Sequence, residues 1–342
     1  EHRMQPTSKL NVAVLMGGKT AEHEVSLQTG VEIANALSRD KYRVLPLVIT
    51  KNGRWVWPGR ALEGPQEQLA LSDVSFPSTI APAIAEPGAA ASPNESGLQR
   101  LEPAPDRPVD VVFIALHGPN GEDGTVQGML ELLDVPYTGS GVMASAVAMN
   151  KPVAQQMLQL AGLTVPPGTV VHAKEWQRSR AGCVARLAED PGLPCVVKPA
   201  GQGSSFGTSI CHAVDELDAA MELALRYEPV AMVEEYIKGT ELTCGVLEDP
   251  DTRDPVPLPV IEIVPKATEF FDFRAKYDPA LTDEIVPARI PDEVAVRVQD
   301  AVHGIVNREP EIIGPGWQGY CRQYRRGGQI EQRALMDRVK NR

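Results

Sequence analysis

The sequence predicts a protein of the α/β (α+β) class whose N-terminal domain is built on a parallel sheet. The first observation is an apolar strand at Leu10–Met16, followed by Gly17-Gly18 and a helical segment from Val25 to Leu37. The second is another apolar strand at Val44–Thr50. A strand, a glycine turn, a helix and a further strand in this order are typical of a parallel sheet covered by helices.

The same pattern returns after a proline-rich stretch. Residues 58–108 hold nine of the 30 prolines and show no regular apolar period, so we expect a partly ordered insertion or surface loop. A third buried strand follows at Asp110–Leu116, and a helix is predicted from Thr125 to Leu133. The loop between them, residues 117–124, leaves the carboxyl end of a strand, which is where α/β folds place ligands.

Composition limits the classes of function. The chain has 342 residues and a net charge of −12, which argues against a general nucleic-acid binder. No apolar run approaches the ~20 residues that span a membrane. The polar segment Glu1–Lys9 lacks the apolar core of a signal peptide. The five cysteines are widely spaced and form no CxxC pair, so we expect free buried thiols in a reducing cytoplasm.

The most informative stretch is Lys198–Ser209, in which a lysine at the end of the strand Cys195–Val197 precedes a loop with three glycines and several hydroxyls. Glycines allow backbone N–H groups to turn toward an anion, and the lysine adds a point charge. The lysine precedes the glycines, so the loop does not fit the Walker pattern. A flexible turn between two strands explains the composition equally well.

Elements on both sides of this loop predict a second and a third region. A helix opens at Met149-Asn150-Lys151-Pro152. The other expected elements are strands at Val196–Lys198, Ser209–His212 and Val230–Glu234, helices at Asp215–Arg226 and Asp292–Ile305, an antiparallel pair of Glu241–Leu247 with Val256–Val264, and an aromatic, charged loop at Phe270–Tyr277. Beyond Ile305 the amino-acid composition changes, since Arg308–Arg342 contains eight basic and four acidic residues.

Several polar residues around the loop are suited to an adenine nucleotide. Lys151 and Lys198 flank one α/β unit and both reach toward phosphates. Glu234, Glu235 and Ile237 end the following strand, where backbone and carboxylate groups can pair with adenine, and Glu241 can accept ribose hydroxyls. Each lysine alone is explained as well by a solvated surface charge. The combination with the glycine loop favours nucleotide binding.

Six ordered motifs now carry a resemblance that covers about Val12 to Val302. They are Gly17-Gly18 with Glu22-His23-Glu24-Val25-Ser26, Leu116–Gly128 (LHGPNGEDGTVQG), Pro136–Gly141 (PYTGSG), Met149-Asn150-Lys151, the glycine loop, and Phe271–Tyr277 (FDFRAKY). In these motifs the chain resembles the D-alanine–D-alanine ligases of the ATP-grasp superfamily. The resemblance implies a three-domain architecture: an N-terminal domain at 10–141 with the 58–108 insertion, a central lid domain at 142–235, an incomplete C-terminal domain at 236–306, and an aberrant tail at 307–342.

The resemblance also implies a reaction. ATP phosphorylates the carboxylate of one D-alanine, the amine of a second D-alanine attacks the acyl phosphate, and the dipeptide enters peptidoglycan synthesis in the cytoplasm. D-Alanine and ATP are then the partners, with Mg²⁺ as the metal, no nucleic acid or membrane, and a homodimer as the assembly. Two alternatives stay open: a D-alanine–D-serine or D-alanine–D-lactate ligase, and a non-catalytic nucleotide-binding relative.

Site residues follow from the matched motifs. The resemblance implies that Glu22 holds the ammonium of the first D-alanine, that Glu22, Ser204 and Tyr277 form a hydrogen-bonded set, and that His117 lies near the first substrate. The ATP-binding set is Lys151, Lys198, Gly203, Ser204, Ser205, Gly207, Glu234, Glu235, Ile237, Glu241 and Lys276. Tyr277 favours D-alanine over D-lactate as second substrate. Each residue also has a structural explanation. The Glu22 carboxylate could stabilise the N-terminus of a helix through its dipole, His117 could be a hydrogen-bonded histidine at the end of a strand, and Tyr277 could pack in the core.

The C-terminal motif departs from the family, which ends with Gly-x-x-Arg-x-Asp and later Glu-x-Asn-x-x-Pro-Gly. The Asp, Glu and Asn of that pattern hold Mg²⁺, which prefers oxygen ligands. Here Gly319 and the catalytic Arg322 are kept, Tyr324 stands in place of the Asp, and no Glu-x-Asn-x-x-Pro-Gly follows. We therefore assign no metal ligand and expect an impaired enzyme. A frame error or truncation after about His303 and a natural inactive relative both explain this tail.

Overall fold

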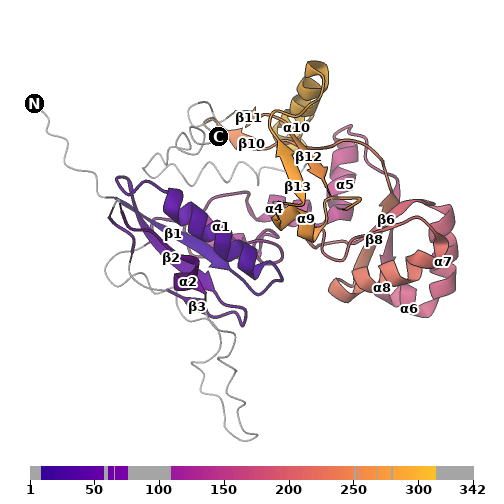
Figure 1. Ribbon diagram of the computed structural model, residues 1–342, viewed down its shortest axis with the longest axis horizontal. Helices are drawn as coiled ribbons and strands as arrows, with labels where there is room; N and C mark the ends of the chain where they lie inside the picture. The colour runs from indigo at the N-terminus through magenta and orange to yellow at the C-terminus, as the bar shows by residue number, and fades with distance from the viewer. Residues whose placement is uncertain are drawn as a thin grey trace, which may run out of the picture. The chain divides into compact units, whose positions relative to one another are not determined.

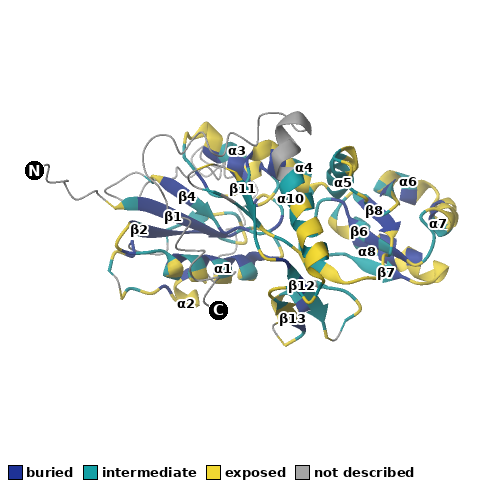
Figure 2. Ribbon diagram, turned by 90° about the horizontal axis from the view of Figure 1, so that it is seen from above, coloured by how far each residue is buried: buried dark blue, intermediate teal, exposed yellow. Residues whose placement is uncertain are grey.

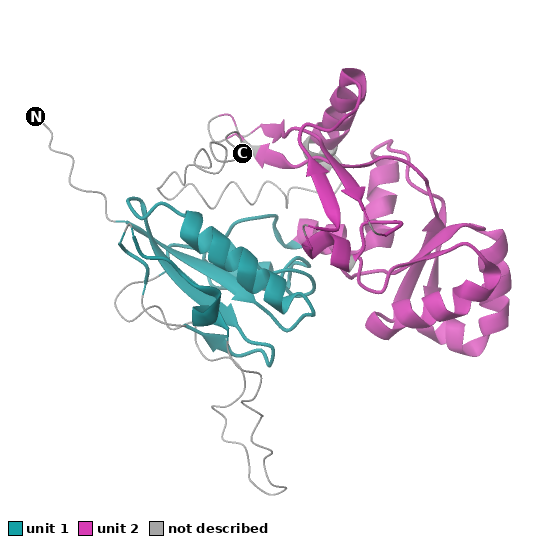
Figure 3. Ribbon diagram, in the orientation of Figure 1, with its two compact units in different colours: residues 1–142 teal, residues 143–342 magenta. Residues whose placement is uncertain are grey.

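The computed structural model describes residues 9–57, 61–64, 66–75, 109–249, 252, 254–266, 268–278 and 280–312. The chain divides into two compact units, residues 1–142 and residues 143–342 (Figure 3). Each unit has a sheet and a core of its own. The further division of the second unit into a lid domain and a C-terminal domain stays a prediction. In the described part of the chain, no helix has both the length and the apolar character needed to cross a bilayer.

The first unit contains the predicted parallel sheet, in the order β3-β2-β1-β4 (Figure 1 and Figure 2). Strands β1 (Leu10–Gly17), β2 (Tyr42–Ile49) and β4 (Val111–Ile114) run parallel, and the short β3 (Trp55–Val56) is antiparallel to β2. Because β1 is central and covered, its residues from Asn11 to Gly17 are all buried, as its continuous apolar sequence predicts. The expectation of an opening α/β sheet is confirmed.

Helix α1 (His23–Ala36) packs on this sheet. Gly30 is the point of closest approach, since a Cβ there would lie 2.5 Å from the Cβ of Met16 on β1. Ser26 joins the same layers, because its hydroxyl donates to the Ala115 carbonyl at 2.6 Å and accepts from the Gly17 N–H at 2.8 Å. This packing fixes the start of α1, and therefore Glu22, at the carboxyl end of β1. Helices α3 (Thr125–Leu132) and α4 (Val142–Met149) follow β4.

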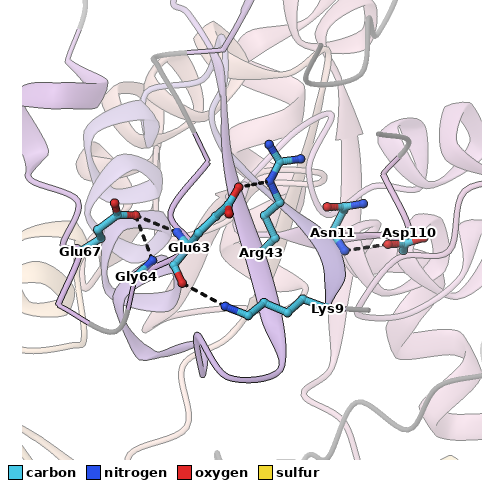
Figure 4. Close-up of polar contacts among 7 residues, drawn as sticks. All are labelled: Lys9, Asn11, Arg43, Glu63, Gly64, Glu67 and Asp110. Carbon is cyan, nitrogen blue, oxygen red and sulfur yellow. Dashed lines mark hydrogen bonds and ion pairs between the residues drawn. The ribbon is translucent and has the colours of Figure 1, made fainter. Parts of the chain in front are cut away.

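The first part of the predicted insertion is ordered on the first unit. Leu62 exchanges two backbone hydrogen bonds with Val44 of β2, at 2.8 and 3.1 Å, and the short helix α2 (Leu71–Val74) buries Val74. Arg43 pairs with Glu63 at 2.6 Å (Figure 4). The sequence pattern is too short to show this, since isolated buried residues alternate with polar ones. Residues 76–108 lie outside the described residues.

The second unit begins within α4, and α5 (Lys151–Leu160) and an antiparallel sheet in the order β5-β8-β6-β7 follow. Its strands are β5 (Gly168–His172), β8 (Val230–Glu235), β6 (Cys195–Pro199) and β7 (Ser209–Cys211). Three helices, α6 (Ala173–Arg178), α7 (Arg180–Glu189) and α8 (Leu217–Tyr227), carry buried residues beside this sheet (Figure 2), and the 3-10 turn Val214–Glu216 precedes α8. Trp176, Leu187 and Met221 are among their largest contributions to the core.

The remaining strands of the second unit correct one prediction. The expected continuous pair is divided between two separate sheets. In the first, β12 (Ile261–Pro265) lies between β9 (Glu241–Thr243) and β13 (Thr282–Ile285), and in the second, β10 (Val246–Glu248) pairs with β11 (Pro255–Pro257). The break falls where Pro257 and Pro259 flank Leu258, because proline has no N–H for a ladder.

Two further elements differ from expectation. The predicted loop before Asp278 contains the short helix α9 (Phe273–Tyr277), which begins at Asp272 because the Asp272 carboxylate accepts from the Ala275 N–H at 2.8 Å. The last helix, α10 (Asp292–Ile312), continues past the predicted end at Ile305. Residues 313–342, with Cys321, Arg322 and Tyr324, lie outside the described residues. Of the described cysteines, Cys183, Cys195 and Cys211 are buried free thiols and Cys244 is a half-buried free thiol.

Candidate functional site

The predicted glycine loop, residues 200–208 (the lid loop), connects β6 to β7 in the second unit. Ser204 and Ser205 both have positive φ, at 48° and 57°, and the Phe206 N–H donates to the Gly203 carbonyl at 3.1 Å. Two successive left-handed residues make a tight turn at the tip of the lid loop. Residues other than glycine rarely adopt this left-handed backbone conformation, and residues that do so are concentrated at functional sites.

Lys198, at the base of the lid loop, forms an ion pair with Glu234 of β8. Val196 lies opposite Glu234 in the β6–β8 ladder, and Lys198 is two residues further along the same face. The other carboxylate oxygen of Glu234 accepts from Gln155 Nε2 of α5 at 2.7 Å. Glu234 is 7% exposed, and each of its two carboxylate oxygens accepts a hydrogen bond in this largely buried position.

Lys151 reaches the lid loop from the start of α5. Asn150 begins this helix, because its side chain accepts from the Val153 N–H at 3.3 Å. The Lys151 N–H donates to the Ala200 carbonyl at 2.9 Å, and its ammonium donates to the Gln202 carbonyl. Burial, followed by the nearby Lys198 ammonium, lowers the pKa of Lys151 to about 8.

Lys276 on α9 is the third lysine of this group, since its charge also lowers the pKa of Lys151. The Lys276 ammonium lies 5.3 Å from the centre of the Phe271 ring, a cation–π distance. Burial raises the pKa of Glu241 on β9, and the Lys276 charge opposes that shift. Lys151, Lys198 and Lys276 thus gather around one place in the second unit. Like charges repel, so such a group favours an anion as its ligand.

Ser204 and Tyr277 form the hydrogen bond that the sequence predicts, with 2.6 Å between their hydroxyl oxygens. Tyr277 is 37% exposed, so the alternative of a core tyrosine is wrong. Ile237 is 60% exposed and Glu235 is also exposed, while Gly207 has a φ of 66° and closes the lid loop. The structure therefore brings most of the predicted nucleotide residues into one unit, with Glu235 and Ile237 on its surface.

The other predicted substrate residues lie in the first unit. Glu22 is the residue before α1 and is 2% exposed, and its carboxylate makes no hydrogen bond that caps the helix. A Cβ at Gly118 would lie 2.3 Å from Glu22 Oε2, and Gly118 has a φ of 70°, so glycine is required there. His117 is half-buried, with its Nε2 atom 3.1 Å from the Thr29 hydroxyl. This contact is compatible with both interpretations of His117.

Two of the catalytic assignments are not tested by this geometry. Glu22 belongs to the first unit, while Ser204 and Tyr277 belong to the second, so the three-residue set stays a prediction. Arg322 lies outside the described residues. Within the described ranges, no group of three or more acidic, histidine or cysteine side chains gathers in a way that would hold a metal ion.

Sequence reasoning missed four residues of the site. Gln155 anchors Glu234, and Gln202 joins Lys151 to Glu228, because Gln202 Nε2 donates to the Glu228 carboxylate at 2.8 Å. The Phe271 carbonyl accepts from the Ser205 hydroxyl at 2.9 Å. Gln155 lies one helical turn after Lys151, which is the one signal that could have shown it.

Known proteins share both the sequence and the fold of this chain. Family models described as D-ala D-ala ligase N-terminus and D-ala D-ala ligase C-terminus match residues 11–140 and 157–308. A D-alanine–D-alanine ligase of Bacillus licheniformis is 39% identical over 313 residues, covering 86% of this chain and 81% of the relative. One of Kineococcus radiotolerans is 41% identical over 306 residues, covering 86% and 79%.

Solved structures of ligases share the fold of this chain. The VanG D-Ala:D-Ser ligase of Enterococcus faecalis has a TM-score of 0.65 at 30% identity, covering 90% of this chain and 83% of that one. The D-alanine–D-alanine ligase of Coxiella burnetii has a TM-score of 0.65 at 25% identity, covering 90% and 78%. These similarities confirm the predicted ATP-grasp architecture. The family models and the relatives show that the chain belongs to the D-alanine–D-alanine ligase family.

Proposed function

We propose that this chain binds ATP beneath the lid loop and uses it to join two D-alanine molecules through an acyl phosphate. The observation that carries the proposal is the convergence of Lys151, Lys198 and Lys276 in the second unit. Three ammonium groups are complementary in sign to a triphosphate, and Lys151 and Lys198 are now held by a carbonyl and a carboxylate that phosphates can replace. The acyl phosphate supplies the leaving group that a carboxylate lacks toward an amine.

The chain's own residues then have separate tasks. We assign adenine and ribose to Glu234, Glu235, Ile237 and Glu241, and phosphate contacts to the three lysines and the lid-loop residues Gly203, Ser204, Ser205 and Gly207. Glu22 is assigned to the ammonium of the first D-alanine, and His117 to its surroundings. The charge of the Glu22 carboxylate supports this role, because a carboxylate and an ammonium form charge-assisted hydrogen bonds. ATP as co-substrate and the free thiols support a cytoplasmic location, and we expect a homodimer.

The experiment that tests nucleotide binding is calorimetric titration of ATP into the chain and into Lys198→Ala. Removing an ammonium that contacts phosphate is expected to weaken ATP binding about tenfold or more, because charge-assisted hydrogen bonds contribute about 1.5–3 kcal/mol. Lys266→Ala is the matched control, since Lys266 is an exposed lysine of the same unit. Equal ATP affinity in Lys198→Ala and in the unchanged chain would contradict the assignment.

Dipeptide formation from D-alanine tests the chemistry, and competition with D-serine and D-lactate tests the second substrate. Tyr277 supports an amine as second substrate, and the similarity to a D-Ala:D-Ser ligase makes D-serine the strongest competitor to include. We also propose that turnover by this chain is slow, because Tyr324 replaces the family's metal-binding Asp. ATP binding with slow product formation is thus the expected result for the unchanged chain.

ATP affinity is expected to fall about tenfold between pH 7 and pH 9. The pKa of Lys151 is lowered to about 8, so its ammonium is present at pH 7 and lost above pH 8. Bound phosphate restores the charge, so binding takes up a proton in this range. Titrations in buffers of different ionisation enthalpy measure that uptake.

The stability of the fold depends on pH in the opposite direction to ATP affinity. A lysine whose folded pKa lies below its unfolded value destabilises the fold while it is charged, so this group adds stability as pH rises above 8. Lys151→Arg is the matched control, because arginine keeps its charge and should give a flat profile across the same range. A profile for Lys151→Arg as steep as that of the unchanged chain would rule out Lys151 as the titrating group.

A further inference from the structure

The tip of the lid loop carries serine where backbone geometry favours glycine or asparagine. Ser204 and Ser205 have φ values of 48° and 57°, and the turn is closed by the Phe206 N–H at 3.1 Å from the Gly203 carbonyl. A left-handed conformation costs free energy at every residue that has a Cβ. Serine at both positions therefore indicates that the two hydroxyls are used.

Both hydroxyls contact one short stretch of chain, residues 268–277, which we call the clasp segment. Ser204 bonds the Tyr277 hydroxyl at 2.6 Å, and Ser205 donates to the Phe271 carbonyl at 2.9 Å. The first bond belongs to the set expected from the family resemblance. The second bond joins the lid loop to the other end of the clasp segment, so the two contacts together fix its direction as well as its position.

The clasp segment is held internally, so a contact at Phe271 is transmitted to Lys276. The Thr268 hydroxyl donates to the Phe270 carbonyl at 2.7 Å, and the Asp272 carboxylate caps α9. The Thr282 hydroxyl, on β13, donates to the Ala275 carbonyl at 2.7 Å. The Phe271 ring then lies 5.3 Å from the Lys276 ammonium. Phe271 thus contacts the lid loop with its carbonyl and the lysine with its ring.

We propose that Ser205 is a positioning residue, whose hydroxyl sets the place of the Lys276 ammonium through Phe271. The proposal rests on the proposed function, in which Lys276 contacts phosphate. It differs from a direct contact between the Ser205 hydroxyl and the nucleotide, because that hydroxyl is already donated to a carbonyl, which leaves the Ser205 backbone N–H for the phosphate contact assigned above. Ser205 acts through Lys276, so its effect on ATP binding depends on Lys276 being present.

A double-variant cycle with ATP as the probe tests this dependence. ATP dissociation constants are measured by calorimetry for the full chain, Ser205→Ala, Lys276→Ala and the double variant. Loss of one partly buried hydrogen bond is expected to weaken ATP binding about three- to tenfold in the unchanged background. In the Lys276→Ala background, Ser205→Ala is expected to change the constant less than about twofold.

Two results overturn the proposal: no effect of Ser205→Ala on ATP affinity, or the same loss in both backgrounds, which would indicate a direct contact with the nucleotide. Ser205→Gly removes the hydroxyl and relieves the left-handed strain, so it gives the same readout without a stability penalty. Ser179→Ala is the matched control, because Ser179 is exposed and makes no capping hydrogen bond. A full chain that does not bind ATP at all contradicts the proposed function itself, which is a different outcome.

Discussion

Replacing Glu234 with alanine is expected to destabilise the second unit by on the order of 3 kcal/mol, because the Lys198 ammonium then lacks its partner in a largely buried place. The Lys198 and Glu234 side chains are 20% and 9% exposed, and Glu234 also accepts the hydrogen bond from Gln155. Removing the carboxylate leaves a charge and an amide without their acceptor. Urea denaturation, followed by the fluorescence of the buried Trp176, measures the change in unfolding free energy.

A matched exposed pair separates this effect from the simple loss of a salt bridge. Lys266 and Asp283 lie in the same unit at 2.6 Å, with side chains 44% and 55% exposed. Asp283→Ala is expected to cost less than about 1 kcal/mol. The double variant Lys198→Met with Glu234→Leu should recover most of the loss, because it removes both charges together. If Glu234→Ala and Asp283→Ala cost the same, burial does not strengthen the first pair.

The Glu234 contacts also show why a nucleotide site can be folded before its ligand arrives. The Lys198 and Lys151 ammonium groups would repel each other if neither had a hydrogen-bond acceptor. Glu234 accepts from Lys198 and the Gln202 carbonyl accepts from Lys151, and these contacts offset the repulsion. Phosphate oxygens can take over these hydrogen bonds without rebuilding the sheet. Under the proposed function, the site exchanges partners on binding, and Glu234 becomes available to the adenine end that we assign to it.

Sequence patterns predicted elements whose signal is local. The strands at Leu10–Gly17 and Tyr42–Ile49 are continuous apolar runs because their sheet is covered, and the Gly17-Gly18 turn marks where α1 can begin. The break at Leu258 was missed, although prolines on both sides remove the N–H groups that a ladder needs. The insertion at 58–108 was predicted as partly ordered or a surface loop, but the sequence did not show which part is ordered, because the buried residues in 61–75 are too few to make a period.

The site residues also divide into those with a local sequence signal and those without one. Lys151 and Lys198 lie in motifs, so their types and spacing were readable before the structure. Gln155, Gln202 and Phe271 were not, because each acts through a partner that is distant in sequence: Glu234 for the first, Lys151 for the second and Ser205 for the third. For Phe271 the acting group is a backbone carbonyl, which no residue pattern can reveal.

Replacing residues 309–342 with the corresponding segment of the Bacillus licheniformis relative is expected to raise dipeptide formation about 100-fold or more. The family-model match ends at residue 308, and beyond it Tyr324 stands where the resemblance in sequence implies a metal-binding Asp. Cations that neutralise charge on a transferred phosphoryl group contribute several kcal/mol to the barrier, and each 1.36 kcal/mol is a factor of about ten. Single-turnover assays with ATP, Mg²⁺ and D-alanine measure the rate.

The matched control is the same graft with its metal-binding Asp changed to Asn, which keeps the size of the side chain and removes the charge. This control should fold like the graft, bind ATP through Lys151 and Lys198, and form dipeptide as slowly as the unchanged chain. The unchanged chain is expected to bind ATP as well, since the three lysines lie before residue 308. Dipeptide formation by the unchanged chain at the rate of the graft would show that residues beyond 308 do not limit turnover, and that Tyr324 does not impair the enzyme.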